Sequence, residues 1–359
     1  MFRRIAVSTA LLGCLLMLSC ARPFVPQRPI PLAVDEPRAD DALYVQWLGV
    51  SSWVVSRGKD VVVIDPFFTS PSFVSVALPL LFRGVFGEFG YNLDRIQDIL
   101  PDLPADTAFV LVGHAHYDHL MDVPYYLARE SGRGATYVGG STARNILLGY
   151  KPAHLDFWIV EEGRPREKGR LRVTAFRSDH APHFLGIKLM SGTVDKPMTS
   201  APRRAGEYVE GETLVYFIDF LDASGRISWR VFVSGSASSP ESALSLRKHS
   251  DFLREHAVDV AILCVPGWDK VDGYPDNILS VLDPANVVLS HYDDFGSAYL
   301  NNEDPKEGMK FVLLARYGGF IRRLEHLKAT HGYRLKIHEP KTGQCIGFPP
   351  SATRLTCEK

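Results

Sequence analysis

The sequence lacks an excess of charge of either sign, internal repeats and long apolar runs. Its 359 residues carry a formal net charge of −1 at pH 7, which excludes the strongly basic surface typical of nucleic-acid-binding proteins. The apolar run at residues 5–18 is too short for a membrane-spanning helix. What the chain does have is 46% hydrophobic and 23% charged residues, an ordinary globular composition with enough apolar material for one large domain or two smaller ones.

Cysteine is also scarce: the chain has five, and two of them lie near the N-terminus. Cys264 lies in the apolar run 260–265 and is expected to be a buried free thiol. Cys345 and Cys357 would form a disulfide only in an oxidising compartment, and only if their Cα atoms come within bonding range. The sequence leaves that disulfide open.

The N-terminus has the pattern of an export signal. Arg3 and Arg4 precede the apolar run, and Ser19 and Cys20 follow it; a basic start, a short apolar run and a small residue before the cut are typical of signal peptides. A cysteine at the cut resembles bacterial lipoprotein signals, in which it becomes the lipidated first residue. Cys20 is favoured by its position, whereas Cys14 matches the motif better but leaves a very short apolar run. A plain secretory signal and an uncleaved anchor fit the same pattern.

These features divide the chain into four predicted parts: a lipoprotein-type signal peptide at 1–20, a proline-rich tether at 21–41, one folded domain at 42–338 and a tail at 339–359. Dense proline gives a stiff, extended segment without a core of its own, which suits a linker that holds a domain off a membrane. The predicted location is the bacterial cell envelope, with the lipid anchor in the membrane and the domain facing the periplasm or the exterior. The sequence does not predict the oligomeric state.

Strand-like and helix-like patterns alternate along the predicted domain. Short apolar runs bounded by turn residues predict strands at 43–48, 52–56, 60–64, 108–112, 135–138, 170–176, 185–190, 213–220, 228–234, 258–264 and 286–289. Helices are predicted at 123–129, at 238–256 and from Asp304 to at least Leu327, the last two opening with a capping residue, a proline and an acid. The first three strands indicate an antiparallel meander, and the whole pattern indicates a layered α/β domain with sheets inside and helices outside.

Two segments interrupt this pattern. Residues 67–91 are rich in aromatic and aliphatic side chains, so they form a short helix packed on the core, line a pocket for an apolar substrate, or touch a bilayer. Residues 191–212 are polar and are predicted to form a surface loop, which is a candidate lid.

The most informative stretch is a dense group of metal-binding residue types. His114, His116, Asp118 and His119 follow the predicted strand at 108–112. Ligands held at the end of a buried strand are rigid, as a metal site requires. Neutral imidazoles with a carboxylate suit zinc, with iron and manganese as alternatives. The other interpretation, a polar loop with chance histidines, is disfavoured by four such residues within six positions.

Two later histidines occupy similar places. His180 follows the predicted strand at 170–176, and His291 follows the one at 286–289. A lone histidine at a strand end is usually structural, but three strand ends at one edge of a sheet can converge on a single site. We therefore predict that both histidines join the first group.

The run 113–119, Gly-His-Ala-His-Tyr-Asp-His, resembles the His-x-His-x-Asp-His signature of the metallo-β-lactamase superfamily. The segments 47–53 and 62–67 resemble the branch that holds bacterial lactonase-like hydrolases and the N-acyl-phosphatidylethanolamine phospholipase D family. The resemblance covers residues 43–295 and is specific at the motifs but weak between them. It implies a four-layer αββα sandwich, with the site at one edge of the two sheets.

The resemblance also implies a ligand set for one or two zinc ions, with manganese or iron not excluded. One metal would take His114, His116 and His180, and the second would take Asp118, His119 and His291. The metals would activate a hydroxide, and Asp118, as the catalytic carboxylate, would also orient it. Asp65 would hold a ligand histidine from behind, although a turn before Pro66 explains this aspartate equally well.

One residue departs from the family pattern. The family usually has an aspartate that bridges both metals after Gly at a strand end, and here Ser236 occupies that place. A neutral hydroxyl cannot replace a bridging carboxylate, so the second metal should bind more weakly or be absent at ordinary concentrations. The change disfavours di-iron redox chemistry. It does not exclude hydrolysis, because one subclass of true metallo-β-lactamases also has serine there and keeps two zincs.

Two further residues are candidates for substrate contact. His180 is favoured over His183 as the metal ligand because it lies nearer to its strand, which leaves His183 to contact substrate. Tyr292 neighbours His291 and can donate a hydrogen bond to a developing oxyanion. Ordinary packing is the alternative for both candidates.

These observations predict a metal-dependent hydrolase, zinc being the expected metal. Its substrate would be a phosphodiester or an ester, either a small molecule or a lipid derivative. A lactam or lactone hydrolase is the alternative, mildly favoured by Ser236, and a non-catalytic metal-binding lipoprotein of the same fold is another. Likeness at the level of the fold does not settle the substrate.

Overall fold

The computed structural model describes residues 31–32, 34, 39–69, 71, 76, 89–183, 188–293 and 316–350. The predicted signal peptide with Cys14 and Cys20, most of the tether, most of the segment 67–91, the start of the helix at Asp304, and Cys357 lie outside these residues. The predictions made for them stay predictions. Within the described part, no helix has both the length and the apolar character that crossing a membrane requires.

The first sheet has seven strands in the order β14-β1-β2-β3-β4-β5-β6. Their bounds are β1 Leu43–Gly49, β2 Ser52–Arg57, β3 Asp60–Ile64, β4 Thr107–Leu111, β5 Thr136–Gly139, β6 Phe157–Ile159 and β14 Cys345–Phe348. The pairs β1–β2 and β2–β3 are antiparallel, which confirms the predicted meander. Strand β14 pairs antiparallel with β1, so the segment 339–359, predicted as a tail, contributes an edge strand to the sheet.

The second sheet also has seven strands, in the order β13-β12-β11-β10-β9-β8-β7. Their bounds are β7 Arg166–Lys168, β8 Leu171–Ser178, β9 Thr213–Leu221, β10 Ile227–Ser234, β11 Val260–Cys264, β12 Asn286–Ser290 and β13 Lys336–His338. Strands β7 to β10 are antiparallel and β10 to β13 are parallel. Cys264 is a buried free thiol, as predicted.

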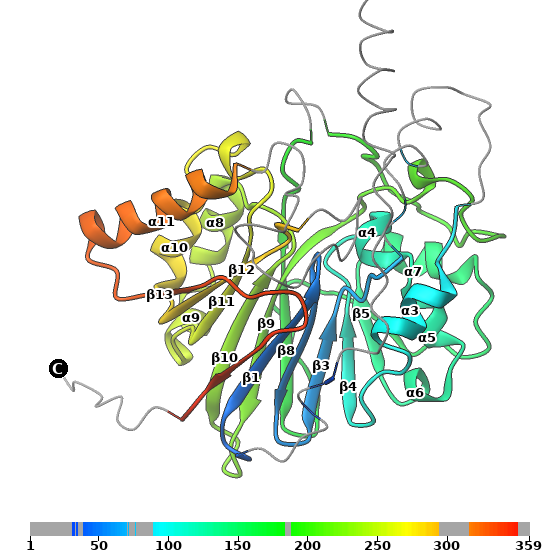
Figure 1. Ribbon diagram of the computed structural model, residues 1–359, viewed down its shortest axis with the longest axis horizontal. Helices are drawn as coiled ribbons and strands as arrows, with labels where there is room; N and C mark the ends of the chain where they lie inside the picture. Colours follow the sequence, from blue (N-terminus) through cyan, green and yellow to red (C-terminus); the bar gives the residue numbers. More distant parts are fainter. Residues whose placement is uncertain are drawn as a thin grey trace, which may run out of the picture.

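Helices cover the outer face of each sheet (Figure 1). On the side of the first sheet lie α3 Leu93–Ile99, α4 Tyr117–Leu120, α5 Val123–Leu127, α6 Glu130–Arg133 and α7 Ser141–Leu148. On the side of the second sheet lie α8 Pro240–Arg247, α9 Ser250–Glu255, α10 Asp276–Leu282 and α11 Tyr317–His331. Two short 3₁₀ turns complete the described elements, at Ala205–Glu207 and Trp268–Lys270. The arrangement is the αββα sandwich that the resemblance implied.

Strand β4 shows how the core is built. Successive side chains of a strand point to opposite faces. Phe109 and Leu111 therefore lie in the core between the sheets, whereas Val110 and Val112 lie in the core under the helices. Because both faces are covered, the strand is a continuous apolar run. This is the run that ends at the histidine cluster.

The predicted helix at 238–256 is two helices, α8 and α9. Ser239 caps α8 as expected, since its hydroxyl accepts the Ser242 N–H at 3.2 Å. Helix α8 buries Ala243 and Leu246, whereas α9 buries no residue. Phe252 and Leu253 of α9 still pack, half-buried, against the core, and the chain leaves the helical conformation at His249, whose φ is −98° and ψ is 40°.

The predicted strand at 185–190 is wrong in its described part. Residues 188–190 form a turn, and Met190 has a left-handed φ of 53°. This conformation is rare for a residue with a side chain and cannot continue a pleated strand. It lets the Met190 carbonyl accept the Glu210 N–H at 2.7 Å, so the chain begins a loop here.

The polar segment at 191–212 is a surface loop, as predicted, and it is tied to α7. The Glu212 carboxylate accepts the N–H groups of Ser141 and Thr142, each at 3.1 Å, at the start of that helix. Further along, the Asn145 side chain donates to the Val194 carbonyl at 2.7 Å. A carboxylate at a helix N-terminus is favoured by the helix dipole, so these contacts fix the loop beside the histidine cluster.

Candidate metal centre

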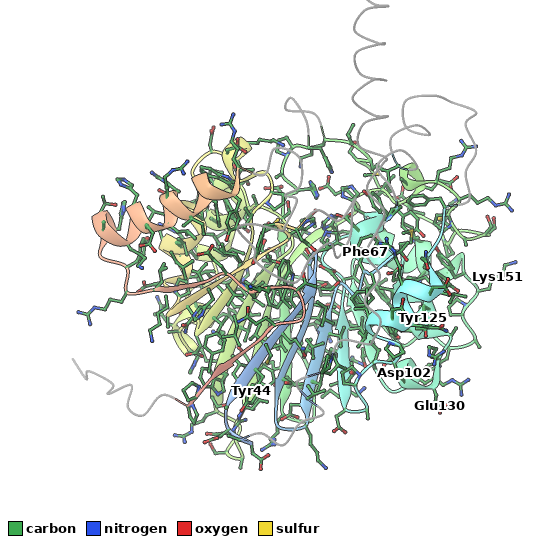
Figure 2. The ribbon with its side chains drawn as sticks, in the orientation of Figure 1. Tyr44, Phe67, Asp102, Tyr125, Glu130 and Lys151 are labelled. Atoms are coloured by element: carbon green, nitrogen blue, oxygen red, sulfur yellow. The ribbon has the colours of Figure 1, made fainter. Side chains whose placement is uncertain are left out.

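The predicted metal-binding residues lie in loops at one edge of the two sheets. His114 follows β4, His180 follows β8 and His291 follows β12. The structure brings these strand ends together, with the rings of His114 and His180 centred 4.7 Å apart. Phe67, after β3, lies near α4 at this end of the first sheet, whereas Tyr44 of β1 lies at the opposite end (Figure 2).

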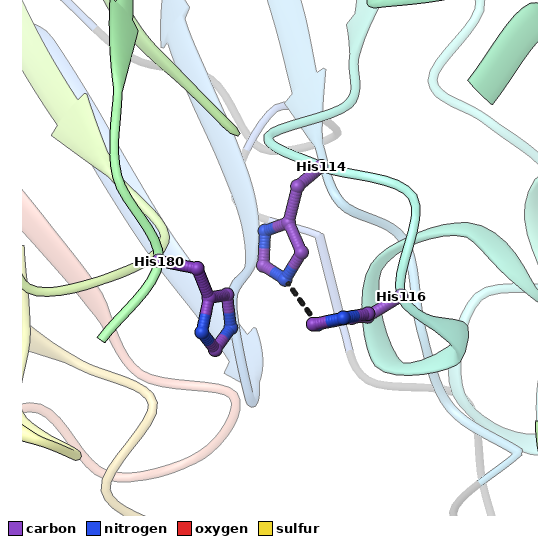
Figure 3. A group of neighbouring side chains, drawn as sticks. All are labelled: His114, His116 and His180. Carbon is purple, nitrogen blue, oxygen red and sulfur yellow. Dashed lines mark hydrogen bonds between the residues drawn. The ribbon is translucent and has the colours of Figure 1, made fainter. Parts of the chain in front are cut away.

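The first group consists of His114, His116 and His180 (Figure 3). Each offers one ring nitrogen, and the three nitrogens lie within 4.8 Å of one another. Nε2 of His114 is 3.0 Å from Nδ1 of His116. This is the trio that the resemblance assigned to one metal.

Backbone carbonyls set the tautomers of two members of this group. A carbonyl can only accept a hydrogen bond, so the ring nitrogen facing it carries the proton. Nε2 of His116 donates to the Met190 carbonyl at 3.3 Å, and Nδ1 of His180 donates to the Ala181 carbonyl at 2.6 Å. The other nitrogen of each ring is then an acceptor, which is the arrangement found in metal-binding histidines.

The histidines of the first group are held neutral. Burial lowers the pKa of His116 to about 3 and lowers the pKa values of His114 and His180 well below their usual range. The neighbouring histidines lower these pKa values further. Neutral imidazole is the form that binds a metal, so the group is ready to bind at neutral pH.

The second group consists of His114, Asp118 and His119, with ligand atoms again within 4.8 Å of one another. His291 lies beside it, with Nε2 3.3 Å from Asp118 Oδ2. The resemblance placed His291 in the second set and His114 in the first alone, whereas here His114 reaches both groups. Asp118 Oδ2 is also 3.8 Å from Nε2 of His119, so one carboxylate faces two imidazoles.

Opposing effects set the pKa values of this second group. Burial alone would raise the pKa of Asp118, but His119 and His291 outweigh it and lower that pKa strongly. Burial alone would lower the pKa of His119, but the carboxylates of Asp65 and Asp118 outweigh it and raise that pKa. Asp118 is therefore ionised at neutral pH and available as an oxygen ligand.

Asp65 lies behind the second group. Its Oδ2 is 2.7 Å from Nδ1 of His119, and its Oδ1 accepts the Gly113 N–H at 2.7 Å. Both residues are almost completely buried. The contact directs the other nitrogen of His119 toward Asp118, which is the geometry proposed for Asp65 from the sequence. Asp65 also has the left-handed φ, 42°, of a tight turn before Pro66. It therefore both orients His119 and forms the turn, the two roles that the sequence analysis considered.

We predict that replacing Asp65 by alanine weakens zinc binding by about 10- to 100-fold, because His119 loses the acceptor that orients its ring. Zinc titration of chelator-stripped protein measures this. Asp60→Asn is the matched control, since Asp60 begins the same strand at its other end and pairs with Arg170 at 3.4 Å. Equal zinc affinity in the two variants would contradict the prediction.

Ser236 lies against the loop that carries His180. Its Oγ accepts the Ala181 N–H at 2.9 Å, and it is almost completely buried. A Cβ at Gly235 would lie only 3.1 Å from Cε1 of His119. The backbone at this point thus touches one ligand histidine, while the Ser236 side chain contacts the loop of another, His180.

The two candidates for substrate contact differ. The ring of His183 stacks on His180, with centroids 4.5 Å apart, and is partly exposed beside the first group. Tyr292 lies elsewhere: it is fully buried, its ring stacks between Trp47 and Tyr317, and its hydroxyl donates to a backbone carbonyl. Its ring and hydroxyl are both occupied, so the structure corrects the suggestion that Tyr292 contacts substrate.

Asp122 is a buried carboxyl near the site that the sequence analysis did not single out. It accepts the N–H groups of Phe68 and Thr69, at 2.5 and 2.8 Å, and the Thr69 hydroxyl. That hydroxyl in turn accepts the Asn92 N–H at 2.7 Å. Asp122 therefore links the described residues on either side of the segment 70–91. No local pattern marks it, because its partners lie more than twenty residues away.

We predict that Asp122 makes the protein less stable as the pH rises from about 4 to about 6. Burial raises its pKa from the ordinary 3.8 to about 6, so in this window the folded state holds a proton that the unfolded state has released. The contribution is on the order of 2–3 kcal/mol, and Asp122→Asn should remove it. Urea unfolding of metal-free wild type and variant at about pH 4 and about pH 7 measures the difference. Parallel pH profiles for the two proteins would disprove the prediction.

The described site therefore fits a metal ion. The side chains that would bind the ion are buried or half-buried, with neutral rings in the first group and an ionised carboxylate in the second. Imidazole nitrogen and carboxylate oxygen are the donors of hydrolytic zinc sites. The fold and this donor set define a metal-dependent hydrolase with the metallo-β-lactamase fold.

Comparison with known proteins identifies the family. The chain is 35% identical over 239 residues to a UPF0173 metal-dependent hydrolase of Cupriavidus taiwanensis, a match that covers 65% of this chain and 70% of that protein. The chain belongs to this family, the UPF0173 metal-dependent hydrolases. A scan of protein-family models found no match.

Two solved structures that align with most of this chain have low sequence identity to it. A metallo-hydrolase of the archaeon Ignicoccus hospitalis has a TM-score of 0.48 and 17% identity, covering 86% of this chain and 98% of its own. The metallo-β-lactamase fold protein YhfI of Bacillus subtilis has a TM-score of 0.45 and 12% identity, covering 86% of this chain and 100% of its own.

Proposed function

We propose that this chain is a zinc-dependent hydrolase that cleaves a phosphodiester or an ester, with lipid-derived substrates as the first class to test. The observation that carries the proposal is the first group, in which His114, His116 and His180 converge as neutral imidazoles. We assign one ion to that group, and Asp118, His119 and His291 to a second, more weakly held ion.

The chemistry follows from these side chains. Bound zinc supplies a Lewis acid that polarises a carbonyl or phosphoryl oxygen and makes a water molecule acidic near neutral pH. We assign the catalytic role to Asp118: its ionised carboxylate would accept a hydrogen bond from the attacking water and keep that water oriented. We assign substrate contact to His183, because it is partly exposed beside the first group.

Support for an apolar substrate comes from the composition of a segment near Asp118. Its neighbour Tyr117 packs edge-on against Phe67 and Phe89, with ring centroids 6.1 and 5.6 Å apart. The described ends of the apolar segment 67–91 therefore lie beside the metal-binding residues. These rings are themselves buried in the core, so the support for a substrate with an acyl chain is the apolar composition of the segment 67–91 in the sequence.

The test is turnover by zinc-loaded protein on a panel of substrates. We expect hydrolysis of bis-p-nitrophenyl phosphate or of a p-nitrophenyl acyl ester, lost on chelation and restored by zinc. Phospholipid vesicles, with release of headgroup or fatty acid as the readout, test the lipid class. Turnover of nitrocefin or an acyl-lactone alone would replace this proposal with a lactam or lactone hydrolase, and no turnover with full zinc occupancy would reject it.

We also propose that the protein is anchored in the bacterial envelope through a lipid on Cys20. The support is the basic start, the apolar run and the proline-rich tether of the sequence. Cys20→Ala should move the protein from the membrane fraction to the soluble fraction, and Cys14→Ala should not. The reverse result would place the lipid on Cys14, and no change in either variant would reject the lipid anchor.

A further inference from the structure

The loop that carries His180 is tied by hydrogen bonds to helix α8 and to the 3₁₀ turn at Trp268–Lys270. At its start, the Asp179 carboxylate accepts the Ser242 hydroxyl of α8 at 2.7 Å. At its end, the Lys270 ammonium donates to the His183 carbonyl. Contacts at both ends restrict the loop, but they lie outside the residue whose side chain would bind the metal.

The middle of this loop is held at Ala181. Its N–H donates to Ser236 Oγ at 2.9 Å, and both residues are almost completely buried. On the other side lies Gly267, where a Cβ would come within 2.6 Å of the Ala181 Cβ. Ala181 is therefore confined between a serine hydroxyl and a glycine that leaves just enough space for it.

The same residue sets the orientation of His180. Nδ1 of His180 donates to the Ala181 carbonyl at 2.6 Å. The hydrogen bonds therefore run from the His180 ring to the Ala181 carbonyl, and from the Ala181 N–H to the Ser236 hydroxyl. A fixed Ala181 backbone therefore holds the His180 ring in one orientation. With Nδ1 of that ring bonded to the carbonyl, Nε2 is the nitrogen that can bind a metal in the first group.

We propose that Ser236 is a positioning residue for His180 and, through it, for the first metal. The inference rests on the proposed function, because it takes His114, His116 and His180 as the ligands. Ser236 uses its oxygen to accept a backbone N–H rather than to bind a metal. Acceptors that orient a ligand from behind raise metal affinity, since the ligand need not be ordered at the moment of binding.

Zinc titration of chelator-stripped protein, in competition with a chromophoric chelator, tests this role. Ser236→Ala removes the acceptor, and we expect zinc to bind about 10- to 100-fold more weakly. Ser236→Thr keeps the oxygen and should restore binding toward the wild-type value. Ser228→Ala is the matched control, because Ser228 lies at the other end of β10 and also makes one hydrogen bond, donating to the Phe220 carbonyl at 2.7 Å.

A second readout separates positioning from general stability. The visible spectrum of the cobalt-substituted protein reports the geometry around the ion, and it should change in Ser236→Ala but not in Ser228→Ala. Urea unfolding of the metal-free proteins measures stability by itself. Lower stability in Ser236→Ala with unchanged zinc affinity and cobalt spectrum would overturn the proposal.

The remaining outcomes are also decisive. Ser236→Gly removes the hydroxyl by a different substitution and takes the place of Ser236→Ala if that variant does not fold. If neither folds, Ser236 supports the fold as a whole and the assignment to His180 is overturned. Wild-type protein that binds no zinc would instead reject the proposed function, on which the ligand assignment depends.

Discussion

Replacing His116 by alanine is expected to lower the hydrolytic rate by at least about a thousandfold. His116 contributes a ring nitrogen to the first group and is almost completely buried. Its loss leaves two imidazoles, which is too few for a stable hydrolytic zinc site. Zinc content of the purified variant and its turnover of the best substrate of the panel measure the effect.

The control is His154→Ala. His154 is exposed and belongs to neither metal-binding group of the described residues, so this variant should keep both zinc and activity. A His116→Ala protein that is folded, lacks zinc and still turns over substrate at the wild-type rate would show that the chemistry takes place elsewhere.

The second large effect concerns stability. Replacing Asp219 by alanine is expected to lower the free energy of unfolding by about 3–5 kcal/mol, because it leaves the Arg230 guanidinium charged and buried with only the more distant, partly exposed Glu255 carboxylate, at 3.5 Å, as an ionic partner. The Asp219 and Arg230 side chains are completely buried on neighbouring strands β9 and β10. They form a bidentate ion pair, in which Arg230 Nε donates to Asp219 Oδ1 at 2.7 Å and Arg230 Nη2 donates to Asp219 Oδ2 at 2.9 Å.

The rest of the Arg230 guanidinium is also satisfied. Nη1 donates to the carbonyls of Phe252 and His256, at 2.8 and 3.0 Å, and the guanidinium lies 4.2 Å from the centre of the Phe252 ring. The pair thus connects the sheet to α9, which buries no residue of its own. Loss of the aspartate should therefore loosen this helix as well.

Urea unfolding of the metal-free protein measures the change in free energy. The matched control is Glu130→Ala, which removes an exposed ion pair with Arg133 and should leave stability unchanged within error, since surface pairs contribute little. An Asp219→Ala protein as stable as Glu130→Ala would contradict the prediction and show that Glu255 or water compensates the Arg230 charge in the folded state.

Much of the fold could be predicted because its central strands are buried on both sides. Strands such as β4 and β11 are continuous apolar runs that end in turn residues, and the sequence analysis located both. Four strands were missed: β6, β7, β13 and β14. They have three or four residues each, and β7 is Arg-Glu-Lys. Segments this short are too brief for an alternating pattern to show, even in β6, whose residues Phe-Trp-Ile favour a strand.

The position of the site was also predictable, for a related reason. A metal-binding residue at a strand end is visible as a histidine after an apolar run, as with His114 and His291. The partners that orient those histidines are not visible in this way. The Met190 carbonyl contacts His116 across 74 positions of the chain, and Ser236 reaches Ala181 across 55.

The sequence by itself determined which residue types could bind a metal and that strands would deliver them to one edge. Only the tertiary structure decided which ring nitrogen of each histidine is available, and it gave Ser236 and Tyr292 contacts that the sequence analysis did not foresee. The physical reason is that every residue has the same backbone carbonyl, and every residue except proline the same N–H, so these groups leave no mark in a sequence. Their role depends on the path of loops that meet only when the two sheets pack together.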